Sequence, residues 1–242
     1  MKTKLQRRGV TGPQALLTLV LCLLSLASIF YVIATDGNTF DIFYCLATVP
    51  FACLPPLLGI VFGWHLNTVL YVVFSFYTMG PLLGAVYKLY YVTPWWDDLL
   101  HLLAGFLFAV CGVYLAYALN RKGTTSVALA ALFGVFFSMG IAVFWEIFEF
   151  SSDVFLGSDM QADTLVDHVA TKLGRTDGGV TVFENITDVV IGGKPLGLGG
   201  YLDIGLYDTM NDMLVETAGA LAYMVYALID RERHPMITSM KK

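Results

Sequence analysis

The chain has 242 residues and a formal net charge of -5, with 57% hydrophobic and only 14% charged residues. A soluble domain carries about 25% charged residues, so the composition excludes an ordinary soluble domain and indicates a membrane protein. The acidic balance gives no support for nucleic-acid binding, which depends on neutralising phosphates with lysine and arginine.

Six apolar segments are long enough to cross a bilayer, which takes about 20 apolar residues in a helix. The connections between most of them are short, which leaves no room for a separate soluble domain. The sequence therefore predicts an all-α, polytopic transmembrane helix bundle that forms a single membrane domain over residues 1–242. The expected spans are 14–34, 40–62, 66–90, 97–119, 126–150 and 207–229, with one long extracytoplasmic loop over 151–206.

Lysine and arginine residues set the expected orientation, because cytoplasmic flanks of membrane helices carry an excess of them. They gather at the N-terminus, in the 120–125 connection and at the C-terminus. Six spans put these three segments on one side, so we expect both termini in the cytoplasm. A cleaved signal peptide is the alternative for the first span. Its apolar stretch exceeds the usual core of about 7–15 residues, which favours a retained helix.

Several local signals refine the helices. Pro55-Pro56 and Gly80-Pro81 are expected to kink or break the second and third spans. Thr93-Pro94 fits an N-cap followed by the first position of the fourth helix. The four cysteines lie in apolar spans without a CxxC spacing, so we expect them to pack as small hydrophobic residues.

The hydrophilic segment from 154 to 205 is the longest predicted loop. Residues 163–173 can form a short amphipathic helix, 177–179 predict a turn and 180–183 predict a brief strand. Loops of this length are usually functional or disordered. A lid over the membrane surface and a loose insertion are both compatible with its sequence.

Three of the apolar segments carry acids, in WWDDLLH at 95–101, FWEIFEFSSD at 144–153 and YDTMND at 207–212. Carboxylates inside membrane spans are costly and mark function by default. A spacing of three or four residues puts such side chains on one helix face. The groups with this spacing are Asp97 with His101, Glu146 with Glu149 and Asp153, and Asp208 with Asp212 and Glu216.

The predicted topology brings all three motifs to the same membrane face. The helix dipole favours acids at a helix N-terminus, which is a structural explanation for Asp97, Asp98 and Asp208. The same dipole disfavours Glu146 and Glu149 near a helix C-terminus. WEIFE is therefore the strongest single motif of the chain.

So many carboxylates cannot all be ionised together at low dielectric. Bound metal, shared protons or extensive hydration would each resolve the repulsion. Helix bundles build carboxylate metal centres in this way, and Mg, Mn, Ca, Zn and Fe all suit oxygen ligands with one imidazole. The predicted metal ligands, which also include the predicted catalytic base, are Asp97, His101, Glu146, Glu149, Asp208 and Asp212.

The same residues carry a resemblance to the YjdF-type family of bacterial inner-membrane proteins and, more distantly, to the VanZ-like family. The family pattern WDxxxHFxxG is similar to Trp96-Asp97 through His101 with Gly105. A WExxE-type motif matches at 145–149, and DTxxDM matches at 208–213. The resemblance covers about residues 95–225 and implies a bacterial membrane location and a shared site, but no reaction. Here about fifty residues separate the last two motifs, which lie close together in that family.

Three functions are compatible with this sequence. The first is a metal-dependent hydrolase or transferase in the bacterial cytoplasmic membrane, acting on a lipid, lipid-linked or small-molecule substrate from the extracytoplasmic side. The second is a cation- or proton-coupled transporter or channel. The third is a non-catalytic membrane interaction protein whose acids specify helix packing. The apolar inner halves of the fourth and fifth spans argue against a continuous transport pathway.

Overall fold

The structure is a computed structural model that describes residues 10–120, 125–173, 175–177, 179–230 and 237–239. Over these residues the chain forms seven helices and eight short strands. It divides into two compact units. The larger unit comprises Met1–Ala142 and Val215–Lys242, and the smaller unit comprises Val143–Leu214.

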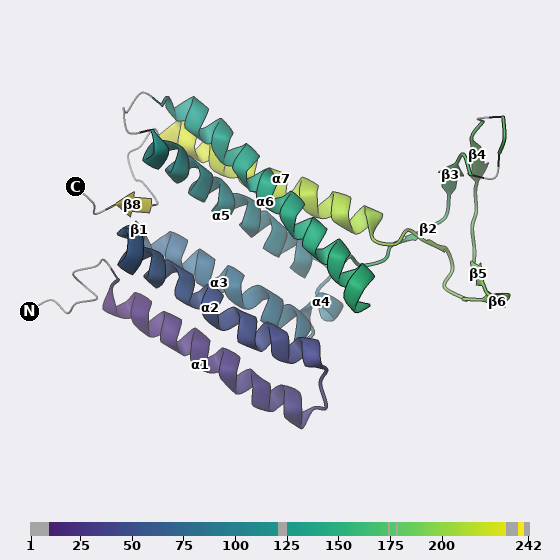
Figure 1. Ribbon diagram of the computed structural model, residues 1–242, viewed down its shortest axis with the longest axis horizontal. Coiled ribbons are helices and arrows are strands. Elements are labelled where there is room, and N and C mark those ends of the chain that lie inside the picture. The colour runs from purple at the N-terminus through teal and green to yellow at the C-terminus, as the bar shows by residue number, and fades with distance from the viewer. Residues whose placement is uncertain (1–9, 121–124, 174, 178, 231–236, 240–242) are drawn as a thin grey trace, which may run out of the picture. The chain divides into compact units, whose positions relative to one another are not determined.

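Six of the helices are long and apolar enough to cross a membrane, which confirms the predicted class of fold. The third ends earlier than predicted, and the fifth continues beyond its predicted end (Figure 1). A seventh helix, α4, is a single turn. In chain order the helices are α1 (Gly12–Ala34), α2 (Thr39–Phe62), α3 (Thr68–Ala85), α4 (Leu89–Val92), α5 (Trp96–Leu119), α6 (Val127–Leu156) and α7 (Leu206–Asp230).

Polar side chains fix where the first three helices begin. Thr11 forms a capping box with Gln14 at the start of α1. Asn38 and Asn67 cap α2 and α3 by accepting a hydrogen bond from a backbone N–H of the first turn. Gly63 ends α2 in the left-handed conformation, which glycine adopts without a steric penalty. These caps satisfy backbone groups that a helix leaves unbonded at its ends.

Two local expectations change. Helices α2 and α3 continue through Pro55-Pro56 and Pro81 as single elements, so the alternative of a break was wrong, and the alternative of a kink stays a prediction. Thr93 ends α4 instead of capping α5, and Trp95 is the residue that precedes α5. Helix α5 therefore begins at Trp96, after the predicted first helical position at Pro94.

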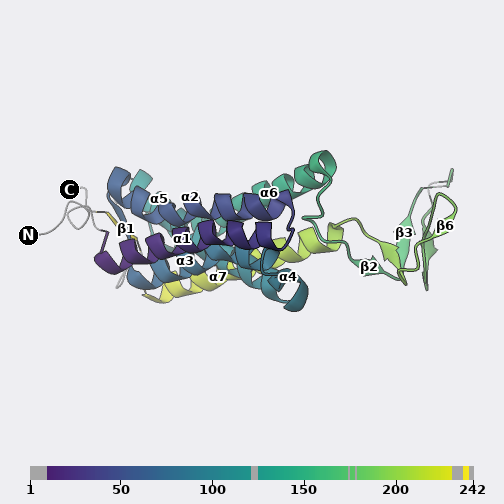
Figure 2. The same cartoon turned by 90° about the horizontal axis from the view of Figure 1, so that it is seen from below.

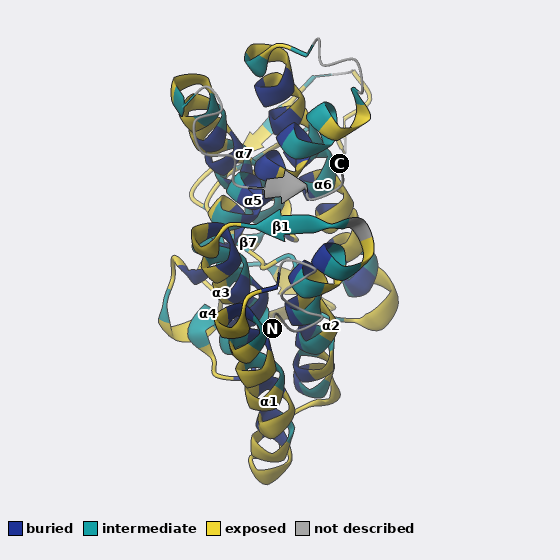
Figure 3. Ribbon diagram, turned by 90° about the vertical axis from the view of Figure 1, so that its left-hand side faces the viewer, coloured by how far each residue is buried: buried dark blue, intermediate teal, exposed yellow. Residues whose placement is uncertain are grey.

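Helices α1, α2 and α3 of the larger unit run alongside one another (Figures 1 and 2). Much of α1 is exposed (Figure 3), and many of its exposed side chains are apolar, as a lipid-facing helix requires. Hydrogen bonds join the helices on their inner faces. The hydroxyl of Ser25 donates to the carbonyl of Cys45, and Tyr71 donates to the carbonyl of Gln14 at 3.1 Å. In lipid, such polar contacts and close packing hold helices together.

Helices α5, α6 and α7 approach closely through small residues. A Cβ atom on Gly105 would lie 1.8 Å from the carbonyl oxygen of Glu216, and one on Gly219 would lie 2.0 Å from that of Leu102. A Cβ on Gly134 would lie 2.7 Å from the carbonyl oxygen of Ala109. These helices therefore meet backbone to backbone, as small residues allow in membrane proteins.

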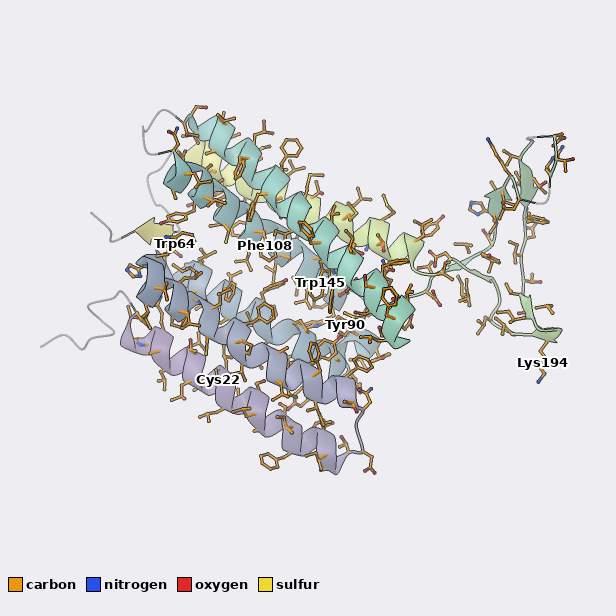
Figure 4. All side chains as sticks on the ribbon, viewed as in Figure 1. Cys22, Trp64, Tyr90, Phe108, Trp145 and Lys194 are labelled. Atoms are coloured by element: carbon orange, nitrogen blue, oxygen red, sulfur yellow. The ribbon has the colours of Figure 1, made fainter. Side chains whose placement is uncertain are left out.

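The connection between α2 and α3 pairs with the end of the described chain. Strand β1 (Trp64–Leu66) is antiparallel to β8 (Ile237–Ser239). Trp64 also packs edge to face against Tyr114 of α5, with ring centroids 4.8 Å apart (Figure 4). This pairing ties the last strand to the helices of the larger unit.

The smaller unit contains three two-stranded antiparallel ribbons between α6 and α7 (Figure 1). The predicted helix over 163–173 was wrong, because its residues contribute to two of these ribbons. The predicted strand over 180–183 is confirmed as β4. The pairs are β2 (Leu165–Val166) with β7 (Tyr201–Leu202), β3 (Val169–Thr171) with β4 (Thr181–Phe183), and β5 (Val190–Ile191) with β6 (Lys194–Pro195).

The basic residues that predict the orientation lie in 1–9, 121–124, 231–236 and 240–242, outside the described residues. The cytoplasmic location of both termini therefore stays a prediction.

The close approach of α5 and α7 generates a stability test. Gly105→Ala should lower the thermal stability of the purified protein, because the added Cβ must displace the backbone of α7. Overpacking of this kind costs about 1–3 kcal/mol. The matched control is Gly140→Ala in α6, where a Cβ would meet nothing within 4 Å. Equal melting temperatures for the two variants in detergent would contradict the backbone contact.

Candidate functional site

Three buried carboxylates gather in the smaller unit. Glu146 and Glu149 lie on the last part of α6, and Asp212 lies on the first part of α7. One carboxylate oxygen from each of the three lies within 4.8 Å of the other two. The exposed fractions of the residues are 7%, 7% and 2%. We call Glu146, Glu149 and Asp212 the carboxylate triad.

A tryptophan orients one member of the triad. The indole Nε1–H of Trp145 donates a hydrogen bond of 2.8 Å to Oε1 of Glu149, one turn further along α6. The ring of Trp145 also packs against Phe148, with centroids 5.4 Å apart. A donor held by ring packing fixes the direction of the Glu149 carboxylate. Within WEIFE, the tryptophan is therefore part of the site, a role that the sequence analysis did not assign.

Asp153 lies one turn beyond Glu149 and organises the chain where it leaves α6. Its Oδ1 accepts hydrogen bonds from the hydroxyl of Ser158 at 2.8 Å and the backbone N–H of Met160 at 2.7 Å. Its Oδ2 accepts one from the backbone N–H of Gln161 at 2.9 Å. These contacts make Asp153 an anchor for the loop.

Asp208 lies one turn before Asp212 and has a matching role where the chain enters α7. Its Oδ2 accepts a hydrogen bond of 2.8 Å from the backbone N–H of Ala162. The side chain of Gln161 donates to the hydroxyl of Thr209 beside it. Among the described residues, Asp208 is not part of the triad, and its predicted role as a metal ligand stays a prediction.

Asp203 fixes the chain just before α7 begins. It accepts hydrogen bonds from the backbone N–H groups of Thr164 and Tyr207, both at 2.7 Å. An aspartate just before a helix is a recognisable capping signal, so the sequence could have revealed part of this role. Gln161 carries no comparable signal. Together the loop anchors hold the ends of α6 and α7 as a hairpin, and the triad lies one turn inward from them.

Two acids of the loop have shifted pKa values. Burial raises the pKa of Asp159, and the negative charges of Asp163 and Asp153 raise it further. In the turn between β3 and β4, a hydrogen bond from Arg175 lowers the pKa of Asp177 to about 2. Asp177 is exposed and stabilises the turn locally.

Asp97 and His101 form the predicted pair on α5 in the larger unit. Nε2 of His101 lies 3.9 Å from Oδ2 of Asp97, and His101 is 8% exposed. The neighbouring Trp96 donates a hydrogen bond of 3.2 Å to the carbonyl of Gly80, which fixes the start of α5 against α3. That Asp97 and His101 share one site with the triad stays a prediction.

The long apolar helices define a multi-pass integral membrane protein. The family model described as Predicted membrane protein (DUF2238) matches residues 16–233, and the chain belongs to that family. Comparisons with curated proteins and with solved structures found no match. The family match extends well beyond the 95–225 region of the YjdF-type and VanZ-like resemblance, and those two relations stay predictions.

The loop anchor generates a second prediction. Asp153→Ala should accelerate hydrogen exchange at the backbone amides of Met160 and Gln161, because both lose a charged acceptor. Such hydrogen bonds contribute about 1.5–3 kcal/mol, so exchange should be at least about tenfold faster. The matched control is Asp163→Ala, which changes an exposed loop acid that accepts neither of these two hydrogen bonds. Unchanged exchange in Asp153→Ala would contradict the anchoring role.

Proposed function

We propose that this chain is a cation-binding membrane protein in which Glu146, Glu149 and Asp212 hold a divalent cation. The proposal is carried by the buried carboxylate triad, whose oxygens lie within 4.8 Å of one another. Three carboxylates at this separation repel one another strongly when they are ionised at low dielectric. A divalent cation would neutralise most of that charge and use the oxygens as ligands.

The chemistry of the triad favours a hard cation. Three carboxylates and no thiolate suit Mg, Mn or Ca, which prefer oxygen ligands. Zn or Fe would gain from an imidazole, and His101 is the predicted source of one. Mg and Mn usually take six ligands, so monodentate binding by the triad would leave positions open for water or for a substrate oxygen.

The open positions support a reaction at the membrane surface. A cation held in this way can polarise a phosphoryl or acyl oxygen and activate water. We propose a metal-dependent hydrolase or transferase that acts on a lipid or lipid-linked substrate. Its proposed location is the bacterial cytoplasmic membrane with the triad toward the extracytoplasmic side. The support is the burial of the triad on two apolar helices at the point where the chain leaves for the loop.

Cation binding is tested on the purified full-length protein, prepared without chelator and titrated with Mn²⁺ in a calorimeter. Wild type should bind Mn²⁺ stoichiometrically. Glu149→Gln and Asp212→Asn should each lose most of this affinity, because each removes a charged ligand. Glu184→Gln, which changes an exposed loop glutamate, should bind like wild type. A wild-type protein that binds no Mn²⁺, Mg²⁺ or Ca²⁺ would overturn the proposal.

Trp145→Phe gives an independent prediction for the same site. It keeps the aromatic packing but removes the N–H that orients Glu149. Loss of such an outer partner typically weakens metal binding by about 10–100-fold. The melting temperature of the cation-free variant should remain close to that of wild type. Unchanged Mn²⁺ affinity would show that the hydrogen bond does not position a ligand.

The reaction is tested separately with lipid-linked phosphates and phospholipids in detergent micelles, with and without Mn²⁺. Turnover that disappears in Asp212→Asn would support the enzyme. Cation flux into proteoliposomes without turnover would favour transport instead.

A further inference from the structure

The connection between α3 and α5 in the larger unit carries a group of large exposed side chains. Residues 87–95 include the single turn of α4, and we call them the connecting segment. Tyr91, Val92 and Trp95 are 80%, 70% and 58% exposed, and Tyr87 is exposed as well. Single apolar residues are common on protein surfaces, but a group on so short a stretch of chain indicates an interaction surface.

Lys88 turns the chain away from α3. Its φ is 66°, in the left-handed region that non-glycine residues rarely adopt. Its Nζ lies 3.5 Å from Oδ2 of Asp41, which is buried at the start of α2, and 5.9 Å from the ring centroid of Tyr91. The ion pair and the ring contact therefore hold the connecting segment in one direction relative to α2 and α3.

Neighbouring aromatic residues along this stretch face different surroundings. A Cβ on Gly84 of α3 would lie 2.2 Å from Cε2 of Tyr90, so Tyr90 packs against α3, whereas Tyr91 is exposed. Trp96 is 6% exposed and donates its indole N–H to a carbonyl of α3, whereas Trp95 is exposed. One member of each pair attaches the chain to the protein, and the other is left for the surroundings.

Local hydrogen bonds satisfy the backbone of the connecting segment. The N–H groups of Tyr91 and Val92 both donate to the carbonyl of Lys88, at 3.0 and 3.2 Å. The N–H of Thr93 donates to the carbonyl of the first residue of α4 at 2.9 Å, and Pro94 has no N–H. These backbone donors are bonded within the segment, as a position beside lipid requires.

We propose that the connecting segment lies in the headgroup region of the bilayer and anchors the protein there. Both helices that it joins, α3 and α5, are long and apolar enough to span the membrane. The segment is thus continuous with lipid-facing chain on both sides, which favours headgroups over a protein partner as the cover of its exposed rings. Tyrosine and tryptophan gather in this region because their rings are apolar and carry one polar group. Lys88 fits it too, with an apolar stem and a charged end.

The anchor sets the depth of the predicted Asp97 and His101 pair. Asp97 is the second residue after Trp95, and its side chain is 39% exposed, compared with 9% for His101. One helical turn, about 5.4 Å, separates the two along α5. With Trp95 among the headgroups, Asp97 lies at the level of the headgroups and His101 one turn deeper. This placement does not depend on cation binding by the triad.

Fluorescence quenching of the full-length protein in phosphatidylcholine vesicles tests the location. The chain has four tryptophans, so the emission lost in Trp95→Phe is that of Trp95. The quencher is bromine, carried on the lipid acyl chain either close to the headgroup or close to the methyl end. Trp95 should be quenched more by the shallow bromine than by the deep bromine, and less by iodide in the water. Quenching by iodide without quenching by bromine would place Trp95 in water and overturn the proposal.

A second reporter tests whether the whole segment shares this depth. Tyr91→Trp, made in the Trp95→Phe background, should give the same preference for shallow bromine. The matched control is Leu23→Trp in the same background, because Leu23 is an exposed residue in the middle of α1. That reporter should prefer deep bromine, and an equal preference of the two reporters would contradict an interfacial segment. Resistance of Tyr91→Trp to bromine and iodide alike would indicate that a second copy or another protein covers the segment, which also overturns the proposal.

Discussion

The cost of burying carboxylates among apolar helices is the constraint on which the rest of this structure depends. An acid in such a bundle must be hydrogen-bonded, protonated or paired with a cation. Asp153 and Asp208 satisfy this requirement with backbone N–H groups of the loop. Glu216 accepts a hydrogen bond from a serine hydroxyl, and one carboxylate oxygen from each member of the triad lies within 4.8 Å of the other two.

The acids near the ends of α6 and α7 form two tiers: an outer tier bonded to the loop and an inner tier that belongs to the triad. On α6, Asp153 follows Glu149 by one turn, and on α7, Asp208 precedes Asp212 by one turn. The outer acid of each helix receives loop N–H groups, and the inner acid belongs to the triad. Because one helical turn separates the tiers, the contacts that order the loop also fix the ends of the helices that carry the triad. The loop is thus part of the support of the site, whatever further role it has.

Close helix packing is a second constraint, and it acts within the larger unit. Glycines on α5, α6 and α7 let backbones meet, so these helices have little freedom to slide in the larger unit. In lipid, packing and hydrogen bonding replace the hydrophobic effect as the force between helices. The hydrogen bonds of a buried hydroxyl such as that of Ser138 stabilise the packed helices, because losing them would leave a buried polar group unsatisfied.

The sequence by itself determined the six apolar helices and the helical spacing of the acids, because both follow from local periodicity and composition. It also singled out WEIFE, because the helix dipole disfavours acids near a helix C-terminus and so cannot explain them. Only the tertiary structure decided which acids anchor the loop, because Ala162 reaches Asp208 across 46 residues of chain. It also decided that part of 163–173 forms strands, since β2 takes its partner, β7, from residues far along the chain, while β3 pairs with the next strand, β4. Pairing at such separations is set by packing and leaves no trace in the local pattern.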